Sequence, residues 1–355
     1  MWSVRLPDTA NEWPIIDASR AYLVLRSGSL VAIALADGRT LWTHQEPSTV
    51  PPASDGTRVV VAHDRAVEAL DVNTGHTLWE AELESNVVAG LTVLGGWVIA
   101  PLASGELAAL RADSGQKLWS QALAGPARTT LVAGDAVVAG LQNGTVVSID
   151  ILTGRTRWER ALGGPVVGLH ASDGRVYAGS QDNYFYCLDE RTGGVNWRVR
   201  TGADLIGRAA SDATRVYLVS LDTLLRALDR RSGVQHWKRA LPARPLAGPV
   251  LIGSLVIVPG LSADVLAYSS RDGKVAGKAS LEVELAAPPI LVAATPGAYY
   301  HLLILTDDGR LTLLQNRVEP PLVPLKELPG VAIPDEPPPA PAVAPTPPKK
   351  PRPSD

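Results

Sequence analysis

The stretch "RVVVAHDRAVEALDVNTGHTLWEAEL" (residues 58–83) decides the fold of this chain. It begins with an apolar run, turns at "HD", continues in a second alternating run and turns again at "NTG" into "HTLWEAEL". Alternation of this kind, with Asp, Asn and Gly at the breaks, is typical of antiparallel strands. The stretch therefore predicts three consecutive strands joined by tight turns.

Tryptophan recurs along the chain at the position that it holds in this stretch. Successive members are 40, 37, 40, 39, 39 and 40 residues apart. These residues, the tryptophan ladder, are Trp2, Trp42, Trp79, Trp119, Trp158, Trp197 and Trp237. A fixed period near forty residues indicates a repeat architecture, in which each repeat is one small unit of strands.

A weaker fourth strand precedes the other three in each unit, as in "NVVAGLTV" (86–93), "GPVVGLHA" (164–171) and "ADLIGRAA" (203–210). Four strands in about forty residues form the blade of a β-propeller. The central hairpins of such blades occur eight times along the chain. The sequence therefore predicts an all-β, eight-bladed propeller.

The last blade needs a strand from the start of the chain. After its hairpin the chain continues as "QNRVEP" (315–320), with no turn glycine and no tryptophan strand. The segment "MWSVRLP" (1–7) matches the outer strands of other units, tryptophan for tryptophan. We expect this N-terminal strand to complete the last blade, because a closed ring leaves no exposed sheet edge there. The predicted propeller spans residues 1–318.

A glycine stands four residues before most ladder tryptophans, in the turn that leads to the outer strand. Glycine is favoured where a tight turn needs a positive φ. We expect each tryptophan to lie across the corresponding turn of the neighbouring blade. The turn glycines are Gly38, Gly75, Gly115, Gly154, Gly193, Gly233 and Gly273. Gly277 takes the tryptophan position of the seventh unit, so we expect a looser contact between the last two blades.

Composition limits the possible functions. The net charge is −3, from 33 basic and 36 acidic residues, and no basic stripe stands out, which argues against nucleic-acid binding. The longest apolar runs, such as "LIGSLVIVPGL" (251–261), are too short to predict a transmembrane segment. We expect a monomer.

The side chains that could carry chemistry are scattered. The six histidines occur singly and no calcium-binding loop of the DxDxDG type is present, so we predict no metal site. Cys187 is the single cysteine and occupies a small-residue position, which favours a core role. We predict no catalytic residue and no cofactor-binding residue. His170 and Arg208 lie in inner strands, so the centre of a propeller could bring them together.

The motif A-x-D-x-x-T-G-x-x-x-W resembles the pyrroloquinoline-quinone-type (quinoprotein) propeller repeat. The best examples are "ALDVNTGHTLW" (69–79), "CLDERTGGVNW" (187–197) and "ALDRRSGVQHW" (227–237). The resemblance covers the chain from about residue 2 to residue 318. It implies the propeller fold, which hosts several functions.

Two branches of this family imply different functions. In length and blade number the chain is similar to the outer-membrane-protein assembly lipoproteins of the BamB family. This resemblance implies a non-catalytic scaffold whose partner is another protein, namely the barrel-assembly machinery. The alternative is an oxidoreductase or sensor that binds pyrroloquinoline quinone with Ca²⁺. The dehydrogenase branch usually carries adjacent, disulfide-bonded cysteines, and this chain has one cysteine.

Several aromatic residues outside the ladder are candidates for contact with a partner. They are Tyr184, Phe185, Tyr186 and Trp97. Exposed aromatics near a rim are common in interfaces, whereas packing within a blade is the alternative explanation for each of them. Trp13, next to Pro14, is either a local plug or an exposed anchor.

The C-terminal segment, residues 319–355, holds 14 of the 29 prolines. Such a composition predicts a disordered tail with extended polyproline character. The tail is a spacer, or "PPKKPRP" (347–353) is a ligand for a proline-recognising groove. The family resemblance implies the cell envelope or periplasm. No signal peptide precedes Trp2, so a chain that truly starts at Met1 is expected in the cytoplasm.

Overall fold

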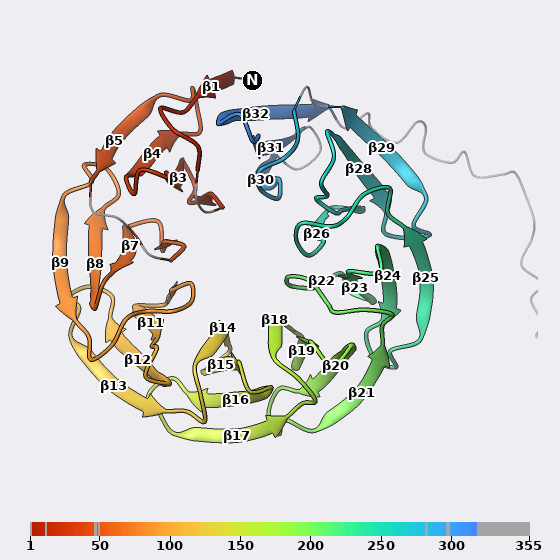
Figure 1. The fold of residues 1–355 in the computed structure, drawn as a ribbon, viewed down its shortest axis with the longest axis horizontal. Helices are drawn as coiled ribbons and strands as arrows, with labels where there is room; N and C mark the ends of the chain where they lie inside the picture. Colours follow the sequence, from red (N-terminus) through yellow and green to blue (C-terminus); the bar gives the residue numbers. More distant parts are fainter. Residues whose placement is uncertain are drawn as a thin grey trace, which may run out of the picture. The chain divides into compact units, whose positions relative to one another are not determined.

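The computed structural model describes residues 2–10, 13–45, 48, 50–280, 283–295 and 299–317. In these residues the regular elements are β-strands, which form eight four-stranded antiparallel sheets around a ring (Figure 1). The predicted all-β, eight-bladed propeller is confirmed. The described residues hold no helix long and apolar enough to cross a membrane. The predicted tail, residues 319–355, lies outside the described residues.

Each blade runs from an inner strand at the centre of the ring to an outer strand at its rim (Figure 1). Blades one and two consist of β2 (Ile15–Ile16), β3 (Arg20–Val24), β4 (Leu30–Ala34), β5 (Thr40–His44), β6 (Ala53–Ser54), β7 (Arg58–His63), β8 (Ala66–Asp71) and β9 (Thr77–Glu82). Blades three and four consist of β10 (Thr92–Leu94), β11 (Trp97–Pro101), β12 (Glu106–Arg111), β13 (Lys117–Ala122), β14 (Ala127–Ala133), β15 (Ala136–Leu141), β16 (Thr145–Asp150) and β17 (Thr156–Ala161).

The second half of the ring repeats this order. Blades five and six consist of β18 (Val166–Ser172), β19 (Arg175–Ser180), β20 (Tyr184–Asp189), β21 (Val195–Arg200), β22 (Ala210–Ser211), β23 (Arg215–Ser220), β24 (Leu224–Asp229) and β25 (Gln235–Ala240). Blades seven and eight consist of β26 (Val250–Ile252), β27 (Leu255–Ile257), β28 (Asp264–Ser269), β29 (Val275–Ser280), β30 (Ile290–Thr295), β31 (Tyr299–Leu305), β32 (Arg310–Arg317) and β1 (Trp2–Arg5).

The hydrophobic core lies between the blades. The two middle strands of a blade are buried on both faces, as in β7 and β8, whereas outer strands such as β9 alternate between exposed and half-buried residues. One cluster joins Val60 and Ala62 of blade two to Val98 and Leu102 of blade three. Each blade is thus stabilised mainly by burial of apolar surface against its two neighbours.

The N-terminal strand closes the ring, as predicted. β1 pairs with β32 in an antiparallel register that sets Trp2 opposite Leu313 and Arg5 opposite Arg310, and the two strands lie side by side in Figure 1. The Leu6 backbone N–H then donates to the Gly309 carbonyl at 2.9 Å. The first and last described segments of the propeller are thereby parts of one sheet.

Each ladder tryptophan reaches the next blade. Its indole Nε1 donates to a backbone carbonyl there, over distances of 2.8 to 3.1 Å. The accepting carbonyls belong to Leu35, Val72, Ala112, Ile151, Glu190, Arg230 and Ser270. A buried indole N–H needs a partner, so these bonds remove the cost of burying each ring between blades.

The indole rings lie against the turn glycines. All seven turn glycines have φ between +66° and +76°, and a Cβ atom on any of them would lie 2.4 to 2.8 Å from a ring atom of the preceding blade's tryptophan. Both the backbone conformation and the close approach therefore require glycine.

Replacing one of these glycines should loosen a contact between blades. We expect Gly193→Ala to lower the free energy of unfolding by about 2–4 kcal/mol, because it combines a strained φ with a clash against Trp158. Gly174→Ala is the matched control, since Gly174 has φ +69° but no atom within 4 Å of the added methyl. We expect that control to lose about 1 kcal/mol. Equal losses in chemical unfolding would contradict the packing argument.

The inner strands are shorter than predicted. The segments 86–93 and 203–210 were expected to be strands, but β10 begins at Thr92 and β22 at Ala210. Earlier in each segment only single bridges form, from Val87 to Leu102 and from Leu205 to Ser220. In blade six the positive φ of Gly207, +64°, interrupts the extended backbone.

The tryptophan ladder has no member between blades seven and eight. In β29 the position of the tryptophan is taken by Gly277, which pairs with Ala267 of β28. There an apolar cluster that includes Ile257, Leu285 and Ile304 joins the two blades. A cavity of about 360 Å³ lies beside it, between Ser280 and the strands of blade eight. The structure thus leaves space at the one junction that lacks a tryptophan contact.

A polar network is buried in blade six. Asp222 accepts hydrogen bonds from Arg226 at 2.5 Å and from Ser220 at 2.6 Å, and the side chains of Asp222 and Arg226 are 16% and 9% exposed. Burial opposes ionisation of Asp222, but these hydrogen bonds lower its pKa to about 2. The network therefore stabilises the folded chain only while Asp222 is ionised.

This network predicts a pH-dependent effect of Asp222→Asn. At pH 7 we expect the variant to lose about 1–2 kcal/mol of unfolding free energy. The stabilisation from a carboxyl with a depressed pKa is present above the unfolded-state pKa, about 3.9, and is lost as pH falls through about 2. The difference between variant and wild type in urea unfolding should therefore shrink below pH 4. Asp113→Asn, at an exposed ion pair, should change little at any pH.

Candidate functional site

A cavity of about 810 Å³ lies at the inner strands of the propeller. Its lining comes from blades one to four, at Trp13–Ile16, Pro51–Ser54, Gly90–Val93 and Arg128–Val132. Arg208, which precedes β22 in blade six, completes the lining. This size is ordinary for a small-molecule site.

Two arginines line this cavity without a partner. Arg128, on β14, is exposed, and no described residue accepts a hydrogen bond from its guanidinium. Arg208 likewise has no hydrogen bond or ion pair with the described residues. Its side chain reaches solvent, yet the surrounding protein lowers the pKa of its guanidinium by desolvation. The cavity thus holds two cationic groups whose charge is uncompensated by the described part of the chain.

The backbone around Arg208 is held by close packing. A Cβ atom on Gly248 would lie 1.9 Å from the Arg208 carbonyl oxygen, and one on Gly168 would lie 2.1 Å from the Gly207 carbonyl oxygen. Glycine at these positions lets the backbones of blades five, six and seven touch at the centre of the ring. Arg208 therefore extends from a rigid point of the fold.

His170 lies close to this arginine. Its Nε2 atom is 2.8 Å from Ser211 Oγ. Burial lowers the pKa of His170, and the charges of Arg230 and Arg208 lower it further. The sequence prediction that an inner-strand His170 comes near Arg208 agrees with this placement. The imidazole is kept neutral, so it adds no third positive charge beside the cavity at neutral pH.

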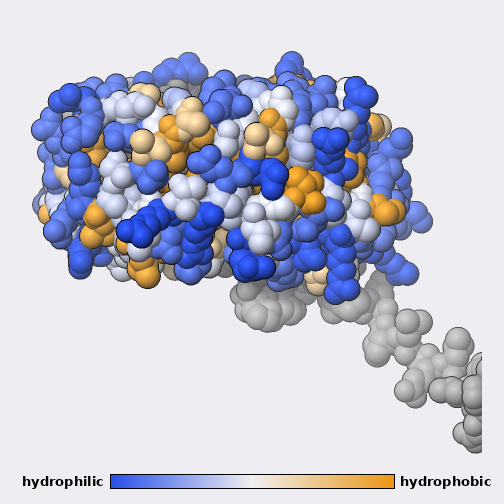
Figure 2. Space-filling model, turned by 90° about the horizontal axis from the view of Figure 1, so that it is seen from below, coloured by the Kyte–Doolittle hydropathy of each residue, from blue (hydrophilic) through white to orange (hydrophobic). Residues whose placement is uncertain are grey.

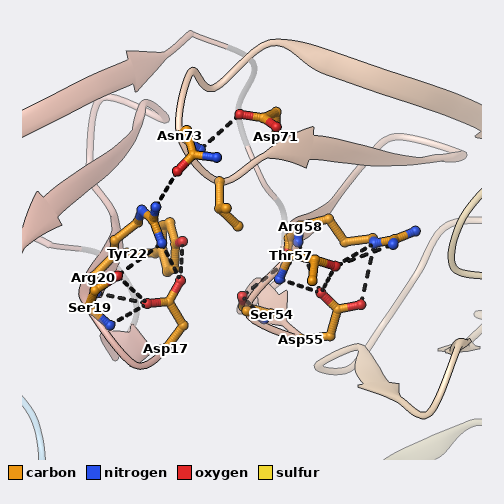
Figure 3. A network of polar contacts seen from close by, with 12 residues as sticks. Asp17, Ser19, Arg20, Tyr22, Ser54, Asp55, Thr57, Arg58, Asp71 and Asn73 are labelled. Atoms are coloured by element: carbon orange, nitrogen blue, oxygen red, sulfur yellow. Dashed lines mark hydrogen bonds and ion pairs between the residues drawn. The ribbon is translucent and has the colours of Figure 1, made fainter.

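Another polar network joins blade one to the turn between β8 and β9 of blade two (Figure 3). Asp17 accepts hydrogen bonds from Tyr22 Oη at 2.6 Å and from the backbone N–H of Arg20 at 2.8 Å. The Arg20 guanidinium reaches Asn73 Oδ1 of blade two (Figure 3). Although burial opposes its ionisation, these hydrogen bonds lower the pKa of Asp17. The carboxylate and its neighbouring donors pair with one another, which is typical of a structural network, and of the Arg20 guanidinium only the buried Nε has no hydrogen-bond partner among the described residues.

The comparison with known families decides the assignment. A family model described as "Outer membrane protein assembly factor BamB" matches residues 26–168 and 142–289, which together are more than half of the chain. The chain belongs to this family. The match runs from β4 of blade one to the end of blade seven and includes six of the seven ladder tryptophans.

Two curated members of the BamB family are similar to parts of the chain. The outer membrane protein assembly factor BamB of Alkalilimnicola ehrlichii is 29% identical over 104 residues, which is 29% of this chain and 27% of that protein. The BamB of Moranella endobia is 25% identical over 139 residues, 34% of this chain and 36% of that protein. The aligned stretch thus spans only about a third of the length of these relatives.

Solved structures share the fold over most of the chain. BamB from Moraxella catarrhalis has a TM-score of 0.73 at 22% identity, covering 89% of this chain and 99% of that one. The quinohemoprotein alcohol dehydrogenase ADHIIG from Pseudomonas putida has a TM-score of 0.68 at 14% identity, covering 85% and 71%. At these identities the likeness shows the propeller fold alone.

The described lining of the cavity lacks the carboxylates that Ca²⁺ beside a quinone would need. Calcium takes six to eight oxygen ligands, usually including carboxylates. The described lining residues are apolar residues, one glycine, hydroxyl residues and two arginines, with no Asp or Glu among them. In the described residues, no three Asp, Glu, His or Cys side chains are grouped so that they could hold a metal ion. This donor set fits an anion rather than a calcium–quinone centre.

The prediction of partner contact is wrong for two residues. Phe185 and Tyr186 are only 2% and 4% exposed, so neither side chain is available to a partner. Phe185 stacks near Tyr177, and the Tyr186 hydroxyl donates to Asp182 Oδ2 at 2.5 Å. Strand β20 lies between two blades, so both faces of its alternating aromatics are buried. Tyr184 at the end of the strand is half-buried.

The tryptophans outside the ladder differ from each other. Trp97 is half-buried and packs against the apolar cluster between blades three and four, which favours the packing explanation over partner contact. Trp13 is 50% exposed and lines the central cavity. The Trp13 side chain is thus exposed at the cavity, and its role as an anchor for a partner stays a prediction.

Arg128 is the cavity residue that sequence reasoning missed. It lies in "ARTTLV" (127–132), an inner strand that reads as an ordinary alternating segment. The available signal was its position in the repeat, because the corresponding positions of most other inner strands are apolar or glycine. A charged side chain at a position that faces the centre of the ring is a candidate for ligand binding, so Arg128 could have been identified from the repeat.

Proposed function

We propose that the chain is a non-catalytic propeller scaffold that binds another protein during the assembly of outer-membrane proteins. The observation that carries this proposal is membership of the BamB family over more than half of the chain. The similar curated proteins bear the name of outer membrane protein assembly factor. We further propose the cell envelope as its location and the barrel-assembly machinery as its partner.

The propeller is physically suited to such a role. Seven tryptophan contacts between blades and the closing strand make one continuous ring, so its surface is presented with little internal motion. The rim seen in Figure 2 is mainly hydrophilic, with small separate hydrophobic patches. Non-obligate interfaces have about this mixture of polar and apolar surface. The surface supports a partner that binds reversibly.

The second candidate function is a quinone-dependent oxidoreductase or quinone sensor. The fold of the chain is shared with a quinohemoprotein alcohol dehydrogenase, but the described cavity residues supply no carboxylate for calcium. We therefore rank this function below the scaffold. An absorbance titration with pyrroloquinoline quinone and Ca²⁺, combined with a dye-linked alcohol assay, separates the two.

The scaffold proposal is tested in the organism that encodes the chain. Deleting the gene should lower the amount of folded barrel proteins in the outer membrane, and the full chain supplied in trans should restore it. A tagged full chain should copurify with the barrel-insertion protein from the envelope fraction. Normal barrel-protein levels in the deletion strain, or a chain found only in the cytoplasm, would overturn the proposal.

A further inference from the structure

We propose that the central cavity binds a small organic polyanion, whose carboxylate or phosphate groups pair directly with Arg128 and Arg208 without a divalent metal ion. This binding site is separate from the rim surface available to a protein partner. The inference goes beyond the scaffold function and does not depend on it.

The first argument is charge. Two guanidinium groups line one cavity, and neither is paired with any described residue. Both side chains are exposed, so water solvates them, and no described carboxylate competes with an incoming anion for either cation. Partial desolvation by the surrounding protein lowers the pKa of Arg208, which strengthens its attraction for an anion. A bound carboxylate or phosphate would supply the missing acceptors, for which the planar guanidinium is the best-matched side chain.

The second argument is the number of anionic groups. Arg128 is on the inner strand of blade four and Arg208 is in blade six. The two guanidinium groups thus enter the cavity from different parts of the ring. A ligand with two anionic groups can pair one group with each arginine, so a polyanion uses both cations of the cavity.

The third argument is the rest of the lining. Trp13 presents a half-exposed indole to the cavity, and Ile15 and Leu131 add aliphatic surface. Thr92 and Thr130 contribute hydroxyls that lie 2.9 Å apart across blades three and four. A volume of about 810 Å³ suits a small organic molecule. The preferred ligand therefore combines its charges with a carbon skeleton that packs on these walls.

The site is also organised before a ligand arrives. Close glycine contacts hold the backbone on both sides of Arg208, and the hydrogen bond between His170 and Ser211 joins the neighbouring inner strands. A fixed backbone limits the conformational entropy that is lost when the arginine side chains pair with a ligand. The neutral His170 leaves the two arginines as the charges that recognise the ligand.

Isothermal titration calorimetry of the full chain tests the site with two probes, citrate and inorganic pyrophosphate, at constant ionic strength in EDTA. We expect one-to-one binding of at least one probe. Arg128→Gln and Arg208→Gln should each weaken it at least tenfold. Arg155→Gln is the matched control, because Arg155 is an exposed arginine in the outer turn of blade four. Its affinity should equal that of the wild type.

The two probes separate carboxylate from phosphate recognition, and binding of either supports the proposal. Thermal melts establish that each variant is folded. No binding of either probe by the full chain would overturn the proposal. So would equal weakening by Arg155→Gln, or binding that appears only after Ca²⁺ replaces EDTA. None of these results bears on protein partners at the rim, so the scaffold function is judged separately.

Discussion

A chain that lacks residues 1–7 should melt about 10 °C or more below the full chain. The deletion removes β1 from β32 and takes away the Trp2 ring, which packs on Gly38 and donates to the Leu35 carbonyl at 2.8 Å. Loss of one large packed side chain alone costs about 3–5 kcal/mol. For a domain of this size each kcal/mol shifts the melting temperature by about 2 °C or slightly more. Buried Leu6 adds to the loss.

Differential scanning calorimetry measures this effect. A deletion of residues 349–355 is the control of equal length, and from its proline-rich composition we expect no change in melting temperature. The opened propeller also exposes the edge of β32, which is a template for strand addition. A synthetic peptide of residues 1–8 should therefore raise the melting temperature of the deleted chain. An unchanged melting temperature after deletion of residues 1–7 would show that the strand does not close the ring.

The fold was predictable because its decisive features are local and repeated. The glycine turn and the tryptophan four residues later define an outer strand within about a dozen residues, and the period counts the blades. The closing strand also followed from this pattern, since Trp2 begins a segment like those at Trp158 and Trp237. The long-range pairing between β1 and β32 could therefore be predicted from this match together with the requirement that a closed ring has no open sheet edge.

The inner strands and the site were less predictable, because contacts between blades determine them. The aromatic residues of β20 were predicted as candidates for partner contact, but a middle strand of a propeller is covered on both faces by the neighbouring blades. Phe185 and Tyr186 were misassigned for this reason. Arg128 of blade four and Arg208 of blade six line the same cavity. The sequence spacing gives the number of blades but not the distances across the ring, so it could not predict that these two residues line one cavity.

Changing Trp158 to Ala should lower the free energy of unfolding by about 3–5 kcal/mol. Trp158 is 9% exposed, its Nε1 donates to the Glu190 carbonyl at 2.9 Å, and its ring lies against Gly193. The variant leaves a cavity between blades four and five and an unpaired carbonyl at its edge. Urea unfolding measures the loss, with Leu152→Ala as control, because Leu152 is 71% exposed in the same blade. That control should change by less than about 0.5 kcal/mol.

A double-mutant cycle identifies the contact responsible. If the ring and the glycine act as one unit, Gly193→Ala should cost much less in the Trp158→Ala background than in the wild type, because the methyl then meets no ring. The residual cost is the strain of a non-glycine residue at φ +66°, about 1 kcal/mol. Additive losses would mean that the two residues stabilise the propeller independently. The ladder would then be a set of separate apolar contacts rather than seven copies of one interlocking contact between blades.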